Sequence, residues 1–330
     1  MEKIIPTRFT KLLSCEVPII AGPMFLVSNV ELVVAVSHSG GIGGMPSLNW
    51  RKTEDFQAAV RQVKSLTNKP FAVNIIVNKS APRQMTDLKV CADEGVPMVV
   101  TSLGNPKEVI EQMHRVGGKV FCDVTNLEYA KKVQDLGADG VIAVGAGAGG
   151  HAGPTSPLVL IPYLAKNLQI PVVAAGGITT GEQILACLVL GASAVQMGTR
   201  FIASREVTVS EKYKNAIVES TPDDIVLTLK LSGVPASVIN TPYIKKIGTD
   251  LSWLEAKIHA QPKLRKYSKM LRYYLGTKSL ETAADKNPTW KEVWSAGQGV
   301  GLIDEILPAA EIMSRLKLEY FNALRAIKTT

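Results

Sequence analysis

Short runs of apolar residues recur through the first 205 residues of this 330-residue chain, at intervals of about 20–30 residues. Each run is continuously apolar rather than alternating, which is typical of strands buried on both faces of a sheet. The predicted strands are Pro18–Ala21, Gly41–Gly44, Phe71–Val77, Met98–Ser102, Lys119–Val124, Gly140–Val144, Pro171–Ala174 and Ala194–Met197. The second is the weakest of them, because glycine makes up most of it.

Helical patterns separate these runs. Asn126–Leu136 carries apolar residues at helical spacing and stops at Gly137, and Thr180–Leu190 follows a threonine cap and stops at Gly191. Eight strands that alternate with helices within about 200 residues predict an α/β fold of the (β/α)8 TIM-barrel type. A doubly wound sheet is the alternative fold, but it seldom needs eight such regular units.

The regular alternation of predicted strands and helices ends after Arg205. Residues 206–290 are more polar and more basic, and we predict a helical insertion or lid after strand eight, with Trp253–Leu275 as one of its helices. Asp304–Ile327 has the pattern of an amphipathic helix that returns to the barrel. The predicted organisation is therefore a barrel over 1–205, an insertion over 206–290, and a returning segment over 291–330.

Composition narrows the class of protein. The hydrophobic share of 46% can bury a large core. No apolar run reaches the roughly 18 residues that span a bilayer, and the first residues lack the pattern of a signal peptide. The cysteines Cys15, Cys91, Cys122 and Cys187 are far apart and form no C-x-x-C pair. We therefore expect a cytoplasmic protein with reduced thiols, no zinc site and no contact with membranes.

The net charge of +8 is unevenly distributed. Nine basic residues lie between Lys245 and Lys278, against only Asp250 and Glu255. Our first interpretation is a solvated helical face, and the alternative is a surface that attracts an anionic partner. Because no nucleic-acid-binding module accompanies the charge, we do not expect a nucleic acid as partner.

Two glycine-bearing turns carry the strongest chemical signal. In barrels, the loops after strands seven and eight often bind phosphate through backbone N–H groups, and glycine lets the main chain approach closely. Ala175, Gly176 and Gly177 follow predicted strand seven, and Gly198 and Thr199 follow predicted strand eight. The sequence thus predicts a phosphate site there, with ordinary tight turns as the alternative.

His151 is the candidate catalytic residue. It lies in the glycine-rich stretch Val144–Pro157, directly after predicted strand six, and Gly150 precedes it. An imidazole with a pKa near 6.5 can take or give a proton at neutral pH. A histidine flanked by glycines at a strand end has little packing to do, so we predict catalysis or direct substrate contact. His38, His114 and His259 have no comparable context.

Further candidates lie at the ends of other predicted strands. Asn74 is polar within an apolar strand, which is costly unless its amide is hydrogen-bonded to a ligand or, alternatively, to neighbouring backbone. Gln298 belongs to a glycine-rich segment that could return to the cofactor or simply form a turn. The remaining candidates, all beside strand ends, are Gly22, Pro23 and Met24 after strand one and Thr101 and Ser102 at the end of strand four.

With these motifs, the chain resembles the nitronate monooxygenase family, formerly called 2-nitropropane dioxygenases. It is also similar to the flavin-dependent enoyl-acyl-carrier-protein reductases, which share the fold. The resemblance rests on AGPM, FAVNI, GAGAGGHAG, AAGGIT, QMGTRFIAS and SAGQGVGLIDE, over about residues 10–205 and 294–309. Gly147 departs from the commoner pattern, in which an acidic or bulkier residue often stands there.

The resemblance implies FMN across the barrel mouth, with its phosphate on Gly176, Gly177, Gly198 and Thr199. It implies that Asn74, Gln196 and the Gly22–Met24 loop contact the flavin, and that His151 is the active-site histidine.

Two activities follow from this resemblance. In a monooxygenase, the histidine deprotonates a nitroalkane, and the flavin oxidises the nitronate with O2 to a carbonyl compound and nitrite. In an NAD(P)H-dependent reductase, the flavin passes hydride to an enoyl thioester or a quinone. A flavin-free isomerase or lyase that binds a sugar phosphate at the same turns is the third hypothesis. The oligomeric state is open, and a dimer is one option.

Overall fold

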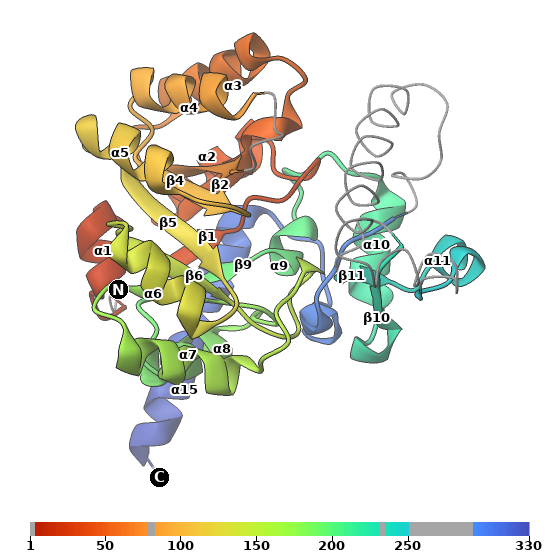
Figure 1. Ribbon diagram of the computed structural model, residues 1–330. Helices are drawn as coiled ribbons and strands as arrows, with labels where there is room; N and C mark the ends of the chain where they lie inside the picture. The colour runs from red at the N-terminus through yellow and green to blue at the C-terminus, as the bar shows by residue number, and fades with distance from the viewer. Residues whose placement is uncertain (1–3, 78–82, 231–234, 251–292, 330) are drawn as a thin grey trace.

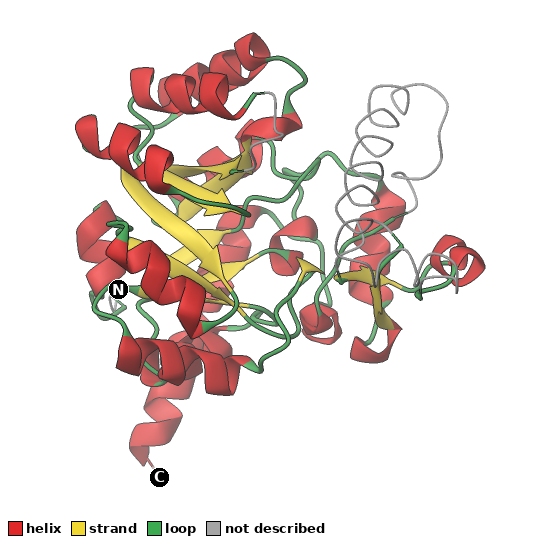
Figure 2. Ribbon diagram, in the orientation of Figure 1, coloured by secondary structure: helices red, strands yellow, loops and turns green. Residues whose placement is uncertain are grey.

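The computed structural model describes residues 4–77, 83–230, 235–250 and 293–329, and its centre is a closed barrel of eight parallel strands (Figures 1 and 2). The strands follow one another around the barrel as β1 (Ile19–Ala21), β2 (Ile42–Pro46), β3 (Phe71–Ile76), β4 (Met98–Ser102), β5 (Lys119–Val124), β6 (Gly140–Val144), β8 (Val172–Ala175) and β9 (Ala194–Met197). The predicted (β/α)8 barrel is confirmed. Each strand lies within two residues of its predicted position, the glycine-rich second strand included.

Helices cover the outside of the barrel (Figure 2). They are α1 (Arg8–Leu13), α2 (Val30–His38), α3 (Thr53–Leu66), α4 (Gln84–Asp93), α5 (Lys107–Arg115), α6 (Leu127–Asp135), α7 (Pro157–Asn167), α8 (Gly181–Val189), the short α9 (Thr199–Ile202) and α15 (Ala309–Thr329). The side chains of Asn126 and Thr180 accept hydrogen bonds from the first turns of α6 and α8, so each helix begins one residue after the start of its predicted range.

The strands are buried on both faces, and successive side chains alternate between them. The inward-facing residues form one apolar cluster, which includes Ile20, Ile42, Ala72, Met98, Val100, Phe121, Ile142, Val173 and Ala194. Phe9 and Leu13 of α1 belong to the same cluster, and the rings of Phe9 and Phe121 meet edge to face at 5.5 Å. Because these two side chains of α1 fill one end of the interior, a ligand site is expected at the opposite edge, where the strands end.

The chain after β9 forms an accessory unit beside the barrel (Figure 1). Its described part contains α10 (Glu211–Glu219), the 3-10 turn η2 (Pro222–Asp224), β10 (Ile225–Thr228), β11 (Ala236–Ile239) and α11 (Pro242–Ile247). The antiparallel strands β10 and β11 make a three-stranded sheet with β7 (Gly150–His151), which comes from the loop after β6. The prediction of a helical insertion therefore missed a sheet, because strands of four residues are too short to show a period. The predicted helix Trp253–Leu275 lies outside the described residues.

The C-terminal segment returns to the barrel. After the 3-10 turn η3 (Gln298–Leu302), α15 packs along α8 and α2. This helix begins at Ala309 and not at Asp304, because Pro308 precedes it and the stretch before pairs with Ser204 through Leu307. No helix in the described part of the chain is long and apolar enough to cross a membrane.

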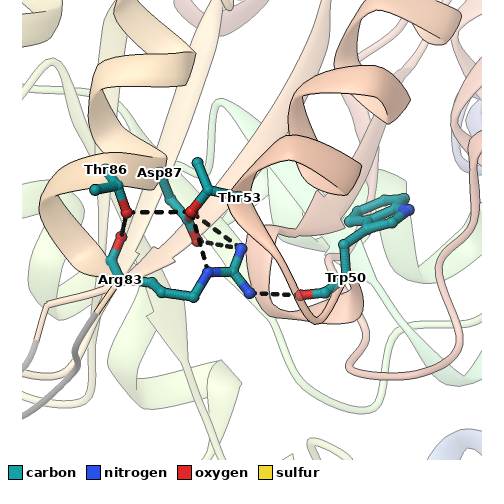
Figure 3. A network of polar contacts seen from close by, with 5 residues as sticks. All are labelled: Trp50, Thr53, Arg83, Thr86 and Asp87. Carbon is teal, nitrogen blue, oxygen red and sulfur yellow. Dashed lines mark hydrogen bonds and ion pairs between the residues drawn. The ribbon is translucent and has the colours of Figure 1, made fainter.

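A polar network joins the loops that follow β2 and β3 (Figure 3). The Arg83 guanidinium donates to both carboxylate oxygens of Asp87 at 2.9 and 3.1 Å, and to the carbonyl of Trp50 at 2.6 Å. Thr53, the first residue of α3, donates to the same carboxylate at 2.8 Å. Asp87 is only 1% exposed and its carboxylate is hydrogen-bonded by these donors, so the network holds α3 and α4 together at the carboxyl ends of the strands.

Candidate active site at the carboxyl ends of the strands

Polar side chains replace the apolar core at the last inward-facing positions of several strands. The alternation that directs Ala72, Val100, Phe121 and Ala194 inward directs the residues two places later inward as well. These residues are Asn74 of β3, Ser102 of β4, Asp123 of β5 and Gln196 of β9. The barrel mouth is therefore lined by polar groups, whereas the layer beneath it is apolar.

The turns after β8 and β9 offer backbone donors to the mouth. Gly176 and Gly177 have φ values of +118° and +69°, a conformation that favours glycine. In the described part of the chain, the backbone N–H groups of Gly176, Gly177, Gly198 and Thr199 donate to no protein acceptor. Adjacent unpaired N–H groups are what a phosphate requires. The two predicted turns thus have the form of an anion-binding cradle.

The returning segment 297–299 meets this cradle. The N–H of Gln298 donates to the carbonyl of Gly147 at 3.0 Å, and the N–H of Gly297 donates to the Thr199 hydroxyl at 2.9 Å. Gly147 has a φ of +84°, a left-handed backbone conformation that favours glycine. The structure therefore brings Gln298 beside the loops after β6 and β9, as one of the two readings of its motif predicts.

The loop after β1 packs against β9 and the turn that follows it. Gly22 donates to the carbonyl of Met197 at 2.8 Å, and a Cβ on Gly22 would lie 3.1 Å from the Gln196 side chain. Met24 lies against Gly198, with its sulfur 3.6 Å from where a Cβ there would be. The Gln196 Oε1 atom is buried without a hydrogen-bond partner among the described residues. A buried amide oxygen of this kind calls for a ligand.

Asn74, Ser102 and Asp123 form a hydrogen-bonded row across β3, β4 and β5. The Asn74 amide donates to Ser102 Oγ at 2.8 Å and to the Val100 carbonyl at 3.2 Å, and Ser102 donates to Asp123 Oδ2 at 2.5 Å. Burial raises the pKa of Asp123 to about 6. Asp123 was not predicted, although a carboxylate in the apolar run Lys119–Val124 is the same signal that singled out Asn74.

The position of the Thr101 side chain differs from the prediction. Its side chain lies on the outer, helix-facing surface of β4, where a hydrogen bond joins it to Cys122 of β5. Cys122 packs there in the cluster that also holds Val99 and Val120. The prediction that the Thr101 side chain lines the cofactor site is therefore wrong. Ser102 takes that position, because neighbouring residues of a strand point to opposite faces.

His151 lies on β7 and not in an irregular loop. The register pairs His151 with Ala236 and Gly150 with Ser237, so β11 fixes the backbone of the candidate base. The His151 side chain is exposed, yet the surrounding protein desolvates its charged form and lowers its pKa below 6.5. The imidazole is therefore neutral at neutral pH and can accept a proton.

These features fit the FMN that the resemblance to the family implies. The cradle after β8 and β9 suits a phosphate, and the unpartnered Gln196 oxygen is a polar group that a flavin ring can satisfy. A Cβ on Gly176 would come within 3.0 Å of two carbonyl oxygens, so glycine is also required by space. The fold and the site together define a barrel whose mouth carries a cradle of a form that suits a phosphate.

A family model described as nitronate monooxygenase matches residues 6–88 and 81–319. The chain belongs to the nitronate monooxygenase family, whose members are oxidoreductases.

Similar proteins of known sequence or structure match nearly the whole chain. The structure of FabK from Thermotoga maritima has a TM-score of 0.84 and is 35% identical, with 99% of each chain covered. A nitronate monooxygenase of Pseudomonas aeruginosa is 32% identical over 94% of this chain and 97% of its own length. A (3aS,4S,5R,7aS)-5-hydroxy-7a-methyl-1-oxo-octahydro-1H-indene-4-carboxyl-CoA dehydrogenase of Rhodococcus jostii strain RHA1 is 28% identical over 97% and 99%. The names differ in substrate, so the family fixes the fold and oxidoreductase class more firmly than the substrate.

Proposed function

We propose that the chain is an FMN-dependent nitronate monooxygenase that oxidises an alkyl nitronate with O2 to a carbonyl compound and nitrite. The structural observation that supports the proposal is the cradle of unpaired backbone N–H groups after β8 and β9, beside the buried Gln196 oxygen, which together suit FMN. Membership of the nitronate monooxygenase family supports the same reaction.

Different residues of the barrel mouth would bind different parts of FMN. The N–H groups of Gly176, Gly177, Gly198 and Thr199 would bind the FMN phosphate, with no side chain between backbone and ligand. Gln196, Asn74 and the Gly22–Met24 loop would contact the ring, with Ala175, Gly150 and Gln298 beside them. The chemistry that FMN supplies when bound is electron transfer from the nitronate to O2.

His151 would extend the reaction to neutral nitroalkanes. Its neutral imidazole takes the proton from the carbon that carries the nitro group, which leaves the nitronate. Because β11 fixes the β7 backbone, the imidazole keeps its place while the proton moves.

An NAD(P)H-dependent reductase of an enoyl thioester or a quinone is the second candidate. Two comparisons favour it: the likeness to FabK of T. maritima, and the R. jostii relative, whose name is that of a dehydrogenase of a carboxyl-CoA. Lys245 and Lys246 on α11 belong to the basic stretch and could attract the phosphates of a thioester carrier or of NAD(P)H.

Oxygen uptake by the purified protein, given an alkyl nitronate and no NAD(P)H, separates the candidates. Rapid uptake with stoichiometric nitrite release supports the monooxygenase. A yellow, FMN-loaded protein that consumes no oxygen but is bleached by NADH supports the reductase. A colourless protein that releases no flavin on denaturation contradicts both, and supports the sugar-phosphate isomerase or lyase.

A further inference from the structure

Asp123 is an unusual carboxylate for the inside of a barrel. Its Oδ2 accepts the Ser102 hydroxyl, whereas its Oδ1 is buried and has no hydrogen-bond partner in the described part of the chain. The described residues also place no cation within ion-pair distance of it. A buried carboxylate oxygen without a donor is costly to the fold, and such atoms are uncommon unless a ligand completes them.

The row of hydrogen bonds has a fixed direction. The Asn74 amide donates to Ser102 Oγ, so the only Ser102 proton is directed to Asp123 Oδ2. A carboxylate that receives a short hydrogen bond is favoured in its ionised form. Oδ1 is therefore left as an acceptor that awaits a donor, and neither Asn74 nor Ser102 can supply one.

The position of the row in the barrel indicates which donor reaches it. In the strand order, β3 and β4 lie across the barrel from β8 and β9, whose turns form the phosphate cradle, and β5 is the next strand after β4. A cofactor anchored by its phosphate at those turns and lying over the mouth presents its other end to β3–β5. For FMN that end is the ring, which carries an N–H group.

We propose that Asp123 is a cofactor-contacting residue whose Oδ1 accepts a hydrogen bond from the flavin ring and thereby sets the redox potential of the flavin. This inference rests on the proposed flavin dependence. It adds a role for a carboxylate that the proposed reaction does not use.

The charge on Asp123 gives the contact a measurable signature. An ionised carboxylate disfavours negative charge added to a nearby ring, so it lowers the flavin's midpoint potential. Since the pKa of Asp123 is about 6, this effect is present above that pH and is lost as the pH falls through it. Electrons added to the ring favour proton uptake from solvent by Asp123. The neighbouring titratable groups, Cys122 and Tyr129, have raised pKa values and stay neutral in this range.

The test compares Asp123→Asn with the unchanged protein. The amide keeps the shape and can still accept from Ser102, but it removes the charge and turns a donor toward the ring. We expect about tenfold weaker FMN binding. We also expect a higher midpoint potential at about pH 8, with a difference that shrinks below about pH 6. Asp135→Asn, which removes an exposed carboxylate at the end of α6, is the matched control and should change neither quantity.

Ser102→Ala provides an independent variant. The Ser102 hydrogen bond lowers the pKa of Asp123, so its loss should move the pH-dependent step in the potential to higher pH while the step itself remains. A merely structural role for Ser102 would change stability without moving that step.

Three results would overturn the inference. One is an Asp123→Asn protein that is folded and binds FMN with unchanged affinity, potential and pH dependence. Another is an unchanged potential combined with an altered KM for the nitronate, which would place Asp123 on the substrate. The third is a wild-type protein that binds no flavin; it removes the proposed function as well, whereas the first two leave that function intact.

Discussion

The proposed role of His151 as a base requires a neutral and correctly placed imidazole, and both conditions depend on the surroundings of this residue. Desolvation lowers its pKa, and the pairing of β7 with β11 fixes its backbone. We expect His151→Ala to retain FMN but to lose at least about 100-fold in turnover of a neutral nitroalkane, the lower end of what a general base contributes. His38→Ala, which changes an exposed histidine at the end of α2, should leave turnover unchanged. Normal turnover by the His151 variant would remove this residue from the mechanism.

The pH dependence follows from the direction of the His151 pKa shift. A lowered pKa keeps the base form present at neutral pH and loses it only as the pH falls through a value below 6.5. Turnover of a neutral nitroalkane should therefore decline only on this acid side. A preformed nitronate needs no deprotonation, so its kcat/KM profile should lack the His151 limb. Identical acid limbs for both substrates would contradict the assignment.

Gly177 combines a left-handed backbone with an N–H group directed to the cradle. A Cβ there would meet nothing closer than 3.8 Å, so Gly177→Ala tests the backbone and not the packing. We expect a loss of about 1 kcal/mol in the free energy of unfolding and about tenfold weaker FMN binding. Gly117→Ala is the matched control: Gly117 has a φ of +78° and open space, but lies in the turn between α5 and β5. That variant should lose similar stability and no FMN affinity, as measured by urea unfolding and fluorescence titration.

At the scale of elements, the Arg83–Asp87 network links α3 to α4 by hydrogen bonds at the barrel mouth (Figure 3). Asp87→Ala leaves a partly buried guanidinium without its carboxylate, and we expect a loss of about 3 kcal/mol in urea unfolding. Asp93→Ala on the same helix breaks an exposed pair with Lys89 and should cost less than about 1 kcal/mol. Equal effects of the two substitutions would show that burial of the pair adds nothing.

At the scale of the whole molecule, strand pairing and side-chain contacts join the accessory unit to the loops at the barrel mouth. The loop after β6 supplies β7 to the accessory sheet, and the returning segment pairs Ser295 with Val238 of β11. Tyr213 of α10 stacks on Trp294 at 5.6 Å and donates to the Ser295 carbonyl. The segment that brings Gln298 to the mouth is therefore held by the same unit that holds His151.

The amino-acid sequence by itself determined the barrel strands, helices α6 and α8, the glycine turns after β8 and β9, and the placement of His151 after β6. Each depends on residues close together in the chain: continuous apolar runs, a capping side chain, or a glycine that permits a positive φ. These features can be recognised in the sequence without knowing which distant residues are in contact.

Only the tertiary structure decided which side chains meet across strands. Thr101 and Ser102 are equally polar in the sequence, and the pleat of β4 in the closed barrel turns Ser102 inward. The contact of Asn74, Ser102 and Asp123 depends on the register of three strands, and the β7–β11 pairing joins residues more than eighty positions apart. Local periodicity carries no information about register or distant pairing, because both are fixed by closure of the barrel and packing of the whole core.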